Sequence, residues 1–474
     1  MLSKSTTLKH FKTICILFCA ASCSGSIEEN QVETYLSVVP PVEVTDRTDL
    51  DVRAGIVNKG HRERNCSVSI YMEHGGVQTK VCQETVAVEP GGSLCIRHIL
   101  ETEGLEGKHG ISLKVISGRD TLLKTNPVSI IRSDIRSTRT AGGAFVGICH
   151  WSETEGKHWN DDIRKLTDED WRSMVRSMHS LGLDIIVIQE LFRNEEYVGR
   201  HATTAESYAG KAYYDSKLYS GRMEITASDP VEAILDEADK LGMHVFPGIG
   251  MFAWFDFTAE SLEWHKMVTR EVWEKYGHHD SFYGFYIPEE SGGSLDNWEK
   301  TPEMRIQRKR EIVAFFKEFK EFCGEFAPGK PIMLATNSFG IKDGMDTYPA
   351  LLEHLDILCP FGFARMPEED MTGKEAAMTL QKLCDQSGAH LWFDLEAFLF
   401  NDDASLYPRD IEGITGDLQM FDNFEKIIFY QYPGVFSDPK ARIRVGEEKT
   451  ETLFMEYSQY LHDTNSSGLY QPYL

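Results

Sequence analysis

Two stretches of the sequence place carboxylates directly after a run of apolar and aromatic residues. Residues 282–290 read Phe-Tyr-Gly-Phe-Tyr-Ile-Pro-Glu-Glu, and residues 390–396 read His-Leu-Trp-Phe-Asp-Leu-Glu. Such a run is typical of a buried strand, and the proline of the first stretch cannot donate to a sheet, so that strand is expected to end there. Two acids at strand ends that share one cleft could act as a proton donor and a nucleophile.

Side-chain alternation ranks the acids within each stretch, because successive side chains of a strand point to opposite faces. In the second stretch, alternation places Trp392, Asp394 and Glu396 on one face. In the first, Glu290 and Glu289 fall on opposite faces, and the more apolar face, which holds Glu289, should meet the helices. We therefore prefer Glu290 and Glu396 as catalytic residues and keep Glu289 as a candidate. Asp394 is interpreted as a charged neighbour that tunes the pKa of Glu396.

Strand-like and helix-like segments alternate from residue 143 onwards. The strands are expected at residues 143–151, 184–190, 244–252, 282–290, 331–337, 357–363, 390–398 and 426–432. Eight consecutive βα units favour a closed (β/α)₈ barrel over an open sheet. Helix starts agree, because Thr167 and Asp229 have capping side chains and precede the helical patterns 168–181 and 230–241. The C-terminal ends of such strands meet at one face, where catalysis takes place.

Aromatic, amide and acidic residues at these strand ends form the expected substrate-binding set. Its members are His150, Trp151, Gln189, Glu190, Trp254, Tyr286, Asn337, Trp392, Asp394, Tyr430 and Tyr432. Aromatic rings stack on the apolar faces of sugars, while amides and acids bind hydroxyl groups. A structural role is the alternative for each residue, since a carboxylate can pair with an arginine and a tryptophan can pack in the core. For Glu190 the structural interpretation is the preferred one.

Residues 32–133 show a different pattern, in which short strands are separated by Gly- and Pro-containing turns. Strands are expected at residues 50–57, 66–72, 80–88, 93–99, 110–116 and 120–131. A spacing of roughly ten residues predicts an antiparallel, all-β sandwich, which resembles the immunoglobulin-like accessory domains of secreted bacterial enzymes. We find no aromatic platform for carbohydrate here and favour a spacer role. Residues 134–141 are the expected linker, and residues 142–474 the barrel domain.

The N-terminus has the composition of a targeting signal. Three lysines precede a short apolar run at residues 13–18, and Ala-Ala-Ser-Cys follows at residues 20–23. The apolar run is too short to span a membrane. The pattern resembles a bacterial lipoprotein signal, which implies that residues 1–23 are a signal peptide, that Cys23 is lipidated and that residues 24–31 are a tether. The protein is then exported and anchored by lipid in the cell envelope, at the outer membrane or cell surface. An ordinary secretory signal is the alternative.

Charge and cysteine spacing exclude several classes of function. The formal net charge of −25 argues against a nucleic-acid partner, because a phosphate backbone requires a basic surface. The sequence has no CxxC zinc-ribbon spacing, no phosphate-binding loop and no dinucleotide fingerprint. We therefore expect no metal and no cofactor.

Several segments of the second domain resemble an uncharacterised bacterial family of glycoside-hydrolase-like TIM barrels. The matching segments are residues 143–147, 182–189, 242–248 and 284–290, together with a tyrosine-rich segment that ends at Tyr219. The chain is more distantly similar to a large glycosidase clan with catalytic glutamates after strands 4 and 7. That resemblance implies Glu290 as acid/base, Glu396 as nucleophile, and retention of configuration. The clan usually has asparagine before the first glutamate, whereas this chain has Pro288 and Glu289.

The sequence therefore predicts a glycoside hydrolase that cleaves oligo- or polysaccharide with two carboxylates. The alternative is a catalytically inactive TIM-barrel lipoprotein that binds glycans at the cell surface, because a fold does not define a function. A third interpretation is a different hydrolysis that uses Cys149, His150 and Glu190.

Overall fold

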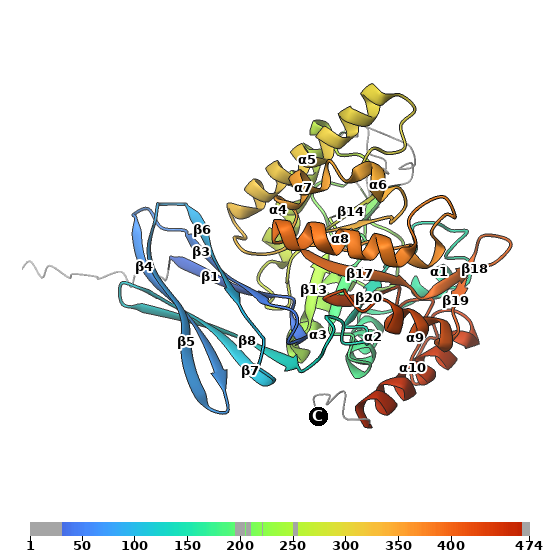
Figure 1. The fold of residues 1–474 in the computed structure, drawn as a ribbon, viewed down its shortest axis with the longest axis horizontal. Helices are drawn as coiled ribbons and strands as arrows, with labels where there is room; N and C mark the ends of the chain where they lie inside the picture. The colour runs from blue at the N-terminus through green and yellow to red at the C-terminus, as the bar shows by residue number, and fades with distance from the viewer. Residues whose placement is uncertain (1–30, 195–203, 205–209, 220, 250–254, 467–474) are drawn as a thin grey trace, which may run out of the picture.

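The computed structural model describes residues 31–194, 204, 210–219, 221–249 and 255–466, which form a β-sandwich and a barrel (Figure 1). The predicted signal, its Cys23 and Trp254 lie outside these residues. None of the described helices combines the length and apolar composition that crossing a membrane would need. The seven described cysteines are all free thiols.

The sandwich consists of two sheets that share one core. The first contains β1 (Val32–Val39), β3 (Leu50–Asn58) and β6 (Ser93–Leu100), and the second contains β2 (Val42–Thr45), β8 (Asp120–Ile131), β7 (Gly107–Ser117), β4 (Arg64–His74) and β5 (Val77–Val88). Inward-facing residues such as Ile56 and Leu113 pack between the sheets. The strand pairs are antiparallel except for β2 and β8, which are parallel. The sequence patterns predicted six of these strands but not β1 and β2.

Eight parallel strands form the barrel. In spatial order they are β13 (His244–Pro247), β10 (Ile185–Ile188), β9 (Gly143–Val146), β20 (Lys426–Tyr430), β17 (His390–Glu396), β16 (Ile357–Leu358), β15 (Ile332–Thr336) and β14 (Phe285–Ser291). Parallel bridges from Val245 to Phe282 and from Gly248 to Tyr286 join the two outer strands. The ring thus closes as a TIM barrel, as predicted from the sequence. The strand β14, predicted at residues 282–290, passes through Pro288 and ends at Ser291, with an irregular register after Ile287.

Helices surround the barrel and follow its strands (Figure 1). The main ones are α2 (Asp168–Ser180), α3 (Pro230–Leu241), α4 (Ala259–Tyr276), α5 (Pro302–Gly324), α7 (Tyr348–Leu352), α8 (Gly373–Ser387), α9 (Ile411–Met420) and α10 (Glu448–Ser466). Thr167 begins α2 with a capping box that it forms with Asp170. Asp229 caps α3, whose first residue is Pro230.

Short elements between the main ones shape the loops of the barrel. They are α1 (Asn160–Ile163), α6 (Ile341–Gly344), the 3₁₀ helix η1 (Phe363–Arg365), and the hairpins β11 (Phe192–Asn194) with β12 (Gly210–Ala212) and β18 (Phe398–Phe400) with β19 (Leu406–Pro408). Two of these elements, η1 and β18, contribute side chains to the site described below.

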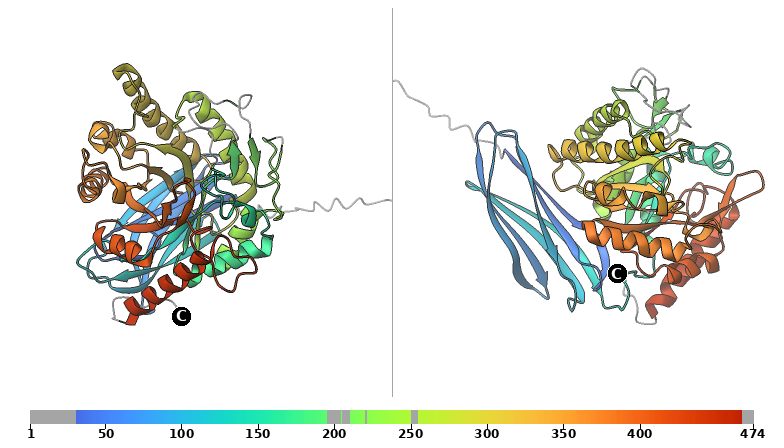
Figure 2. Two further views of the ribbon diagram at one scale, coloured as in Figure 1. Left: turned by 90° about the vertical axis from the view of Figure 1, so that its right-hand side faces the viewer. Right: turned by 45° about the horizontal axis from the view of Figure 1, so that its top comes forward.

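The sandwich covers the N-terminal end of the barrel, with its three-stranded sheet on the barrel side (Figures 1 and 2). Val39 at the end of β1 is fully buried in the cluster that fills the barrel interior. The hydroxyl of Tyr283, two residues before β14, donates to the Val38 carbonyl at 2.6 Å. At Gly55 the backbones are so close that an added Cβ would lie 1.9 Å from the Pro328 carbonyl oxygen. The sandwich therefore forms the floor of the barrel.

A buried network of charges joins the two domains at this floor. Arg53 of β3 binds Asp51 at 2.6 Å and Asp356 of the barrel at 2.9 Å. His390, at the start of β17, lies between Glu425 at 2.6 Å and Asp51 at 3.5 Å. Burial lowers the pKa of His390, but the Glu425 and Asp51 carboxylates outweigh it and raise that pKa to about 9. The imidazolium and guanidinium thus neutralise carboxylates that would be costly to bury alone.

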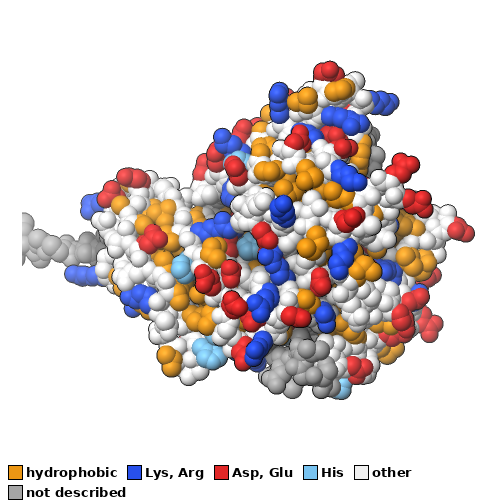
Figure 3. Space-filling model, viewed as in Figure 1, with side chains coloured by type: hydrophobic (Ala, Val, Ile, Leu, Met, Phe, Trp, Pro, Cys, Tyr) orange, Lys and Arg blue, Asp and Glu red, His pale blue; other side chains and the backbone are white. Residues whose placement is uncertain are grey.

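Acidic and basic side chains are interspersed on the face drawn in Figure 3, over the sandwich as well as the barrel.

Candidate active site

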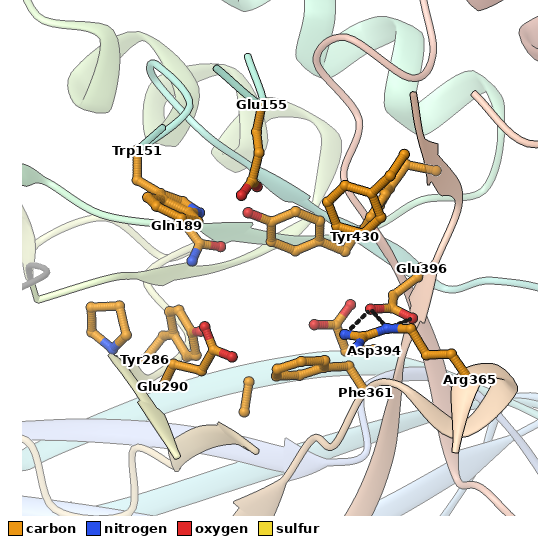
Figure 4. Close-up of a pocket in the computed structure, with 14 residues that line it drawn as sticks. Trp151, Glu155, Gln189, Tyr286, Glu290, Phe361, Arg365, Asp394, Glu396 and Tyr430 are labelled. Carbon is orange, nitrogen blue, oxygen red and sulfur yellow. Dashed lines mark hydrogen bonds and ion pairs between the residues drawn. The ribbon is translucent and has the colours of Figure 1, made fainter. Parts of the chain in front are cut away.

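A cavity of about 210 Å³ lies at the C-terminal ends of the barrel strands (Figure 4). Side chains from β14, β15, β17, β18, β20, η1 and the segments after β9, β10 and β16 line it. These residues are Trp151, Glu155, Gln189, Tyr286, Pro288, Glu290, Ala335, Phe361, Arg365, Asp394, Glu396, Phe398, Phe400 and Tyr430. Seven of them, namely Trp151, Gln189, Tyr286, Glu290, Asp394, Glu396 and Tyr430, belong to the set predicted from the sequence. Four of the fourteen are carboxylic acids.

The alternation of β14 separates its two adjacent glutamates. Glu290 is partly exposed and lines the cavity on the same face as Tyr286 and Pro288. Glu289 points the other way and is fully buried. It accepts the Asp256 backbone N–H at 3.2 Å and lies 4.0 Å from His265. Glu289, retained above as a catalytic candidate, is therefore placed outside the cavity, among the residues that support β14.

Arg365 of η1 holds Glu396 at the end of β17. Its Nη2 donates to Oε1 at 2.7 Å and its Nε donates to Oε2 at 3.0 Å. Both residues line the cavity (Figure 4), so the ion pair lies within the cleft. A fork of this kind binds a carboxylate in one fixed orientation.

Asp394 reaches the cavity two residues before Glu396, on the same face of β17, but is almost fully buried. Burial raises its pKa well above the ordinary value, and the negative charges of Glu396 and Glu290 raise it further. Both effects favour the protonated form of Asp394, which lies beside the carboxylate of Glu396. This is the like-charge coupling expected of carboxyl groups that share a site.

Glu155 is a fourth acid, which the sequence interpretation missed. It lies in the loop between β9 and α1 and reaches the cavity from the side opposite to Glu290 (Figure 4). Its Oε2 lies 3.6 Å from His150 Nε2. Burial and then the charge of Glu290 raise the pKa of Glu155 to about 7. A carboxyl group with such a pKa can give or accept a proton near neutral pH.

Aromatic rings form the walls between these acids. Phe145, inside the barrel, packs against Tyr286 at 5.4 Å and Tyr430 at 5.5 Å between ring centroids. Burial raises the pKa of both tyrosines well above 10, so their hydroxyl groups stay protonated as donors. At the rim, Phe400 on the β18–β19 hairpin is 51% exposed. An exposed ring at the mouth of a polar cavity can stack on the apolar face of a sugar.

Three predicted substrate-binding residues lie away from the cavity. Trp392 is fully buried and packs against Phe246. It lies on the same face of β17 as Asp394 but two residues earlier, and therefore deeper in the barrel. Tyr432 lies on the outer side of the barrel and shares a 2.5 Å hydrogen bond with Ser177 of α2. Asn337 is buried at the end of β15, and its Oδ1 accepts the backbone N–H of Phe339 at 2.9 Å.

Two further predicted residues are placed behind the cavity wall. His150 is 2% exposed, and burial lowers its pKa to about 3, so the ring is neutral and supports Glu155. Glu190 is also buried, and burial raises its pKa to about 8. Cys149 is inaccessible, and burial raises its pKa to about 11, which leaves no thiolate for a nucleophilic reaction. The position of Trp254 is outside the described residues.

Three residues that sequence reasoning missed, Arg365, Glu155 and Phe400, lie outside the eight strands of the barrel. Arg365 follows β16, Glu155 follows β9, and Phe400 lies just beyond β17. A signal was available for two of them, since 398–400 is a second aromatic run after β17 and Arg365 is one of few cations close to a strand end.

Comparison with solved structures finds carbohydrate-active proteins at low identity. A proposed alpha-L-fucosidase from Bacteroides thetaiotaomicron VPI-5482 is 16% identical, with a TM-score of 0.49 over 68% of this chain and 94% of that chain. A beta-glucuronidase from Bacteroides uniformis is 13% identical, with a TM-score of 0.41 over 90% of this chain and 49% of that chain. A GH2 beta-galacturonidase from Eisenbergiella tayi is 11% identical, with a TM-score of 0.39 over 94% and 73% of the two chains. The chain thus spans about half the length of the beta-glucuronidase.

A search of curated proteins gives no match. The family described as "Domain of unknown function (DUF4434)" matches residues 143–443, a range that contains all strands of the barrel and all residues that line the cavity. Since the match covers more than half of the chain, the protein belongs to the DUF4434 family.

Proposed function

We propose that the protein is a glycoside hydrolase that cleaves oligo- or polysaccharide with two carboxylates. The observation that carries this proposal is that β14 and β17 bring Glu290 and Glu396, from distant parts of the chain, into one cavity. Glycoside cleavage requires a pair of carboxyl groups that flank the scissile bond. Aromatic walls and the Gln189 amide add the chemistry that binds rings and hydroxyl groups of a sugar.

In the proposed mechanism, Glu396 attacks the anomeric carbon while Glu290 donates a proton to the leaving oxygen. Arg365 holds Glu396 as a carboxylate in one orientation. The products of this step are the freed alcohol and a glycosyl ester of Glu396. A water molecule then gives a proton to Glu290 and attacks the ester, which releases the sugar with retained configuration and restores both carboxyl groups.

Glu155 gives the cavity a second exchangeable proton. Two neighbouring carboxylates repel each other, so the loss of a proton from one carboxyl group raises the pKa of the other. The two groups therefore titrate as a pair, which holds one proton over a range of pH. Because the charge of Glu290 contributes to the raised pKa of Glu155, we assign Glu155 and Glu290 to such a pair. Glu155 then keeps a proton available in the cavity near neutral pH.

One observation favours a second candidate function, glycan binding without hydrolysis. Arg365 engages both oxygens of Glu396, and a nucleophile whose lone pairs are bound in this way reacts only if the ion pair opens. A barrel with such a locked carboxylate could hold a sugar and leave it intact.

For localisation we propose export and lipid anchoring through Cys23. The basic residues, short apolar run and Ala-Ala-Ser-Cys sequence at the N-terminus support this proposal. Expression of the wild type and of Cys23→Ser, followed by separation of membranes from soluble material, tests it. The wild type should sediment with membranes and the variant should not, and equal sedimentation of both would contradict the anchor.

The test of function is a panel of plant and host glycans with analysis of the products. We expect the purified wild type to release a defined sugar from at least one glycan, and Glu290→Gln and Glu396→Gln to lose that activity. Glu368→Gln is a matched control, because Glu368 is exposed in the segment after η1 and does not line the cavity. Binding to a glycan in wild type and variants alike, with no product from any of them, would support the non-catalytic alternative instead.

A further inference from the structure

Two histidines and a carboxylate meet on the outside of the barrel, away from the cavity. His278 and His279 lie in the turn between α4 and β14, and Glu232 lies in the first turn of α3. One ligand atom from each of these three residues lies within 4.8 Å of the others. His279 is buried, Glu232 is partly buried and His278 is exposed, so the group is anchored by a fixed residue and open to solvent on one side.

A carboxylate behind His279 fixes the orientation of its ring. Asp239, two turns after Glu232 on α3, has Oδ2 2.7 Å from His279 Nδ1. The other oxygen of Asp239 accepts the Ser281 backbone N–H at 2.7 Å. When a carboxylate accepts the Nδ1–H of a histidine, it selects the tautomer whose Nε2 lone pair is available to a metal ion. The structure therefore presents His279 Nε2 toward Glu232.

The distance between His279 Nε2 and Glu232 Oε2 fits two ligands of one metal ion better than a direct charge-assisted hydrogen bond. His279 Nε2 and Glu232 Oε2 are 3.4 Å apart, whereas a charge-assisted N–H···O bond is about 2.7–2.9 Å long. Zinc binds histidine nitrogen and carboxylate oxygen at about 2.0–2.2 Å in tetrahedral geometry. Two ligand atoms on such an ion are then roughly 3.4 Å apart, which is the separation found.

We propose that Glu232, His278 and His279 bind a divalent transition-metal ion, with Asp239 as the positioning residue behind His279. Two imidazoles and one carboxylate suit Zn²⁺, which prefers nitrogen ligands more strongly than Mg²⁺ or Ca²⁺ does. A water molecule completes the tetrahedron. The ion joins α3 to the turn before β14.

This position gives the ion a structural role at the seam between the domains. The neighbouring Asp280 pairs with Lys124 of the sandwich at 2.7 Å. His278 and His279 also line a hollow of about 710 Å³ between the sandwich and the barrel. An ion that fixes the turn at residues 278–279 therefore stabilises the contact between the barrel and β8 of the sandwich. It takes no part in the chemistry of the cavity, which lies at the other end of the barrel.

Calorimetric titration of the chelator-treated full chain with ZnCl₂ tests the site. The wild type should bind one equivalent, and His278→Ala and Glu232→Gln should each bind ~10-fold or more weakly. His278 is exposed, so its replacement leaves folding intact. Asp239→Asn keeps all three ligands and should still weaken binding by about 10-fold. Zn²⁺ should also raise the melting temperature of the wild type but not that of His278→Ala.

His462→Ala is the matched control, since His462 is an exposed histidine next to a carboxylate, 3.7 Å from Asp463 on α10. This variant should bind Zn²⁺ like the wild type. The proposal is overturned if the wild type takes up no stoichiometric Zn²⁺, or if His278→Ala and Glu232→Gln bind as tightly as His462→Ala does.

Discussion

Arg365 donates hydrogen bonds to both carboxylate oxygens of Glu396, with Nη2–Oε1 and Nε–Oε2 distances of 2.7 and 3.0 Å. The guanidinium of Arg365 also lies over the ring of Phe339, 5.1 Å from its centroid. The contacts with Phe339 and Glu396 together restrict the movement of the Arg365 side chain. Glu396 is therefore oriented before any substrate binds. The same contact would support a nucleophile that must point at an anomeric carbon, or restrain a carboxylate that only binds.

Replacement of Arg365 separates these two roles. Arg365→Lys keeps the positive charge but loses the planar fork that binds both oxygens. If Arg365 orients the nucleophile, kcat should fall by about 100-fold, the cost of removing one preorganised charge-stabilising group, while KM changes little. Arg442→Gln, which breaks an exposed pair with Asp170, should leave kcat unchanged. A rise of kcat in Arg365→Lys would show that the ion pair restrains Glu396.

The pH dependence of hydrolysis should report on Glu155. Its pKa is raised to about 7 by burial and by the charge of Glu290, so Glu155 is protonated below this pH and ionised above it. A rate that needs this proton falls as pH rises through about 7. In profiles of kcat/KM against pH, the wild type should show this fall near pH 7, and Glu155→Gln should not.

The coupling to Glu290 gives a sharper form of this prediction. Glu290→Gln removes a negative charge that raises the pKa of Glu155, so that pKa should fall in the variant. Carboxyl ¹³C NMR titration measures it directly, without activity. Glu368→Gln, which changes an exposed glutamate outside the cavity, is the control. An unchanged Glu155 pKa in Glu290→Gln would mean that the two groups do not interact.

Phe400 should contribute to substrate binding rather than to the chemical step. Its ring is 51% exposed at the rim of the cavity, and the adjacent Leu399 is similarly exposed but does not line it. Loss of one stacking ring costs roughly 1 kcal/mol, so Phe400→Ala should raise KM about fivefold and leave kcat nearly unchanged. Leu399→Ala should behave like the wild type. Equal effects of both substitutions would exclude a specific stacking contact.

Arg53 should be a major contributor to the stability of the whole chain. It is buried between Asp51 and Asp356 at the floor of the barrel. Arg53→Met removes the cation and leaves carboxylates of both domains undercompensated, which should lower the free energy of unfolding by about 3 kcal/mol. Urea unfolding measures this loss. Arg47→Met, at an exposed arginine of the same domain, should change it by less than about 0.5 kcal/mol.

His390 should make stability depend on pH at this interface. Its folded-state pKa of about 9 exceeds the ordinary value of 6.5, so its contribution is complete below pH 6.5 and is lost as pH rises through about 9. The difference in melting temperature between the wild type and His390→Gln should therefore be largest near pH 6 and shrink toward pH 9. His61→Gln, at an exposed histidine of the sandwich, should follow the wild type throughout. A difference that does not depend on pH would contradict the raised pKa.

Strong local patterns made most of the barrel predictable. The apolar runs that become β14 and β17, and the capping residues Thr167 and Asp229, are signals contained in a few neighbouring residues. Alternation within a strand also ranked Glu290 ahead of Glu289, because a strand with one face toward the helices must point its polar side chain the other way.

Features that depend on distant contacts were not predictable in this way. Alternation assigns Trp392 and Asp394 to the same face, but it gives no depth along the barrel axis, and depth decides that only Asp394 reaches the cavity. Glu155 lies in the loop after β9 and Arg365 in the short helix η1 after β16, and in such connections position is set by packing against other strands. Likewise, Val39 and Arg53 carry no local sign that the sandwich forms the floor of the barrel.

The most direct test of the central claim is the rate of sugar release from the best glycan of the panel by the wild type, Glu290→Gln and Glu396→Gln. Each variant should be slower by at least about 1,000-fold while its melting temperature and its affinity for the glycan stay close to those of the wild type. Release at the wild-type rate by either variant would remove that carboxyl group from the mechanism and contradict catalysis by the Glu290–Glu396 pair.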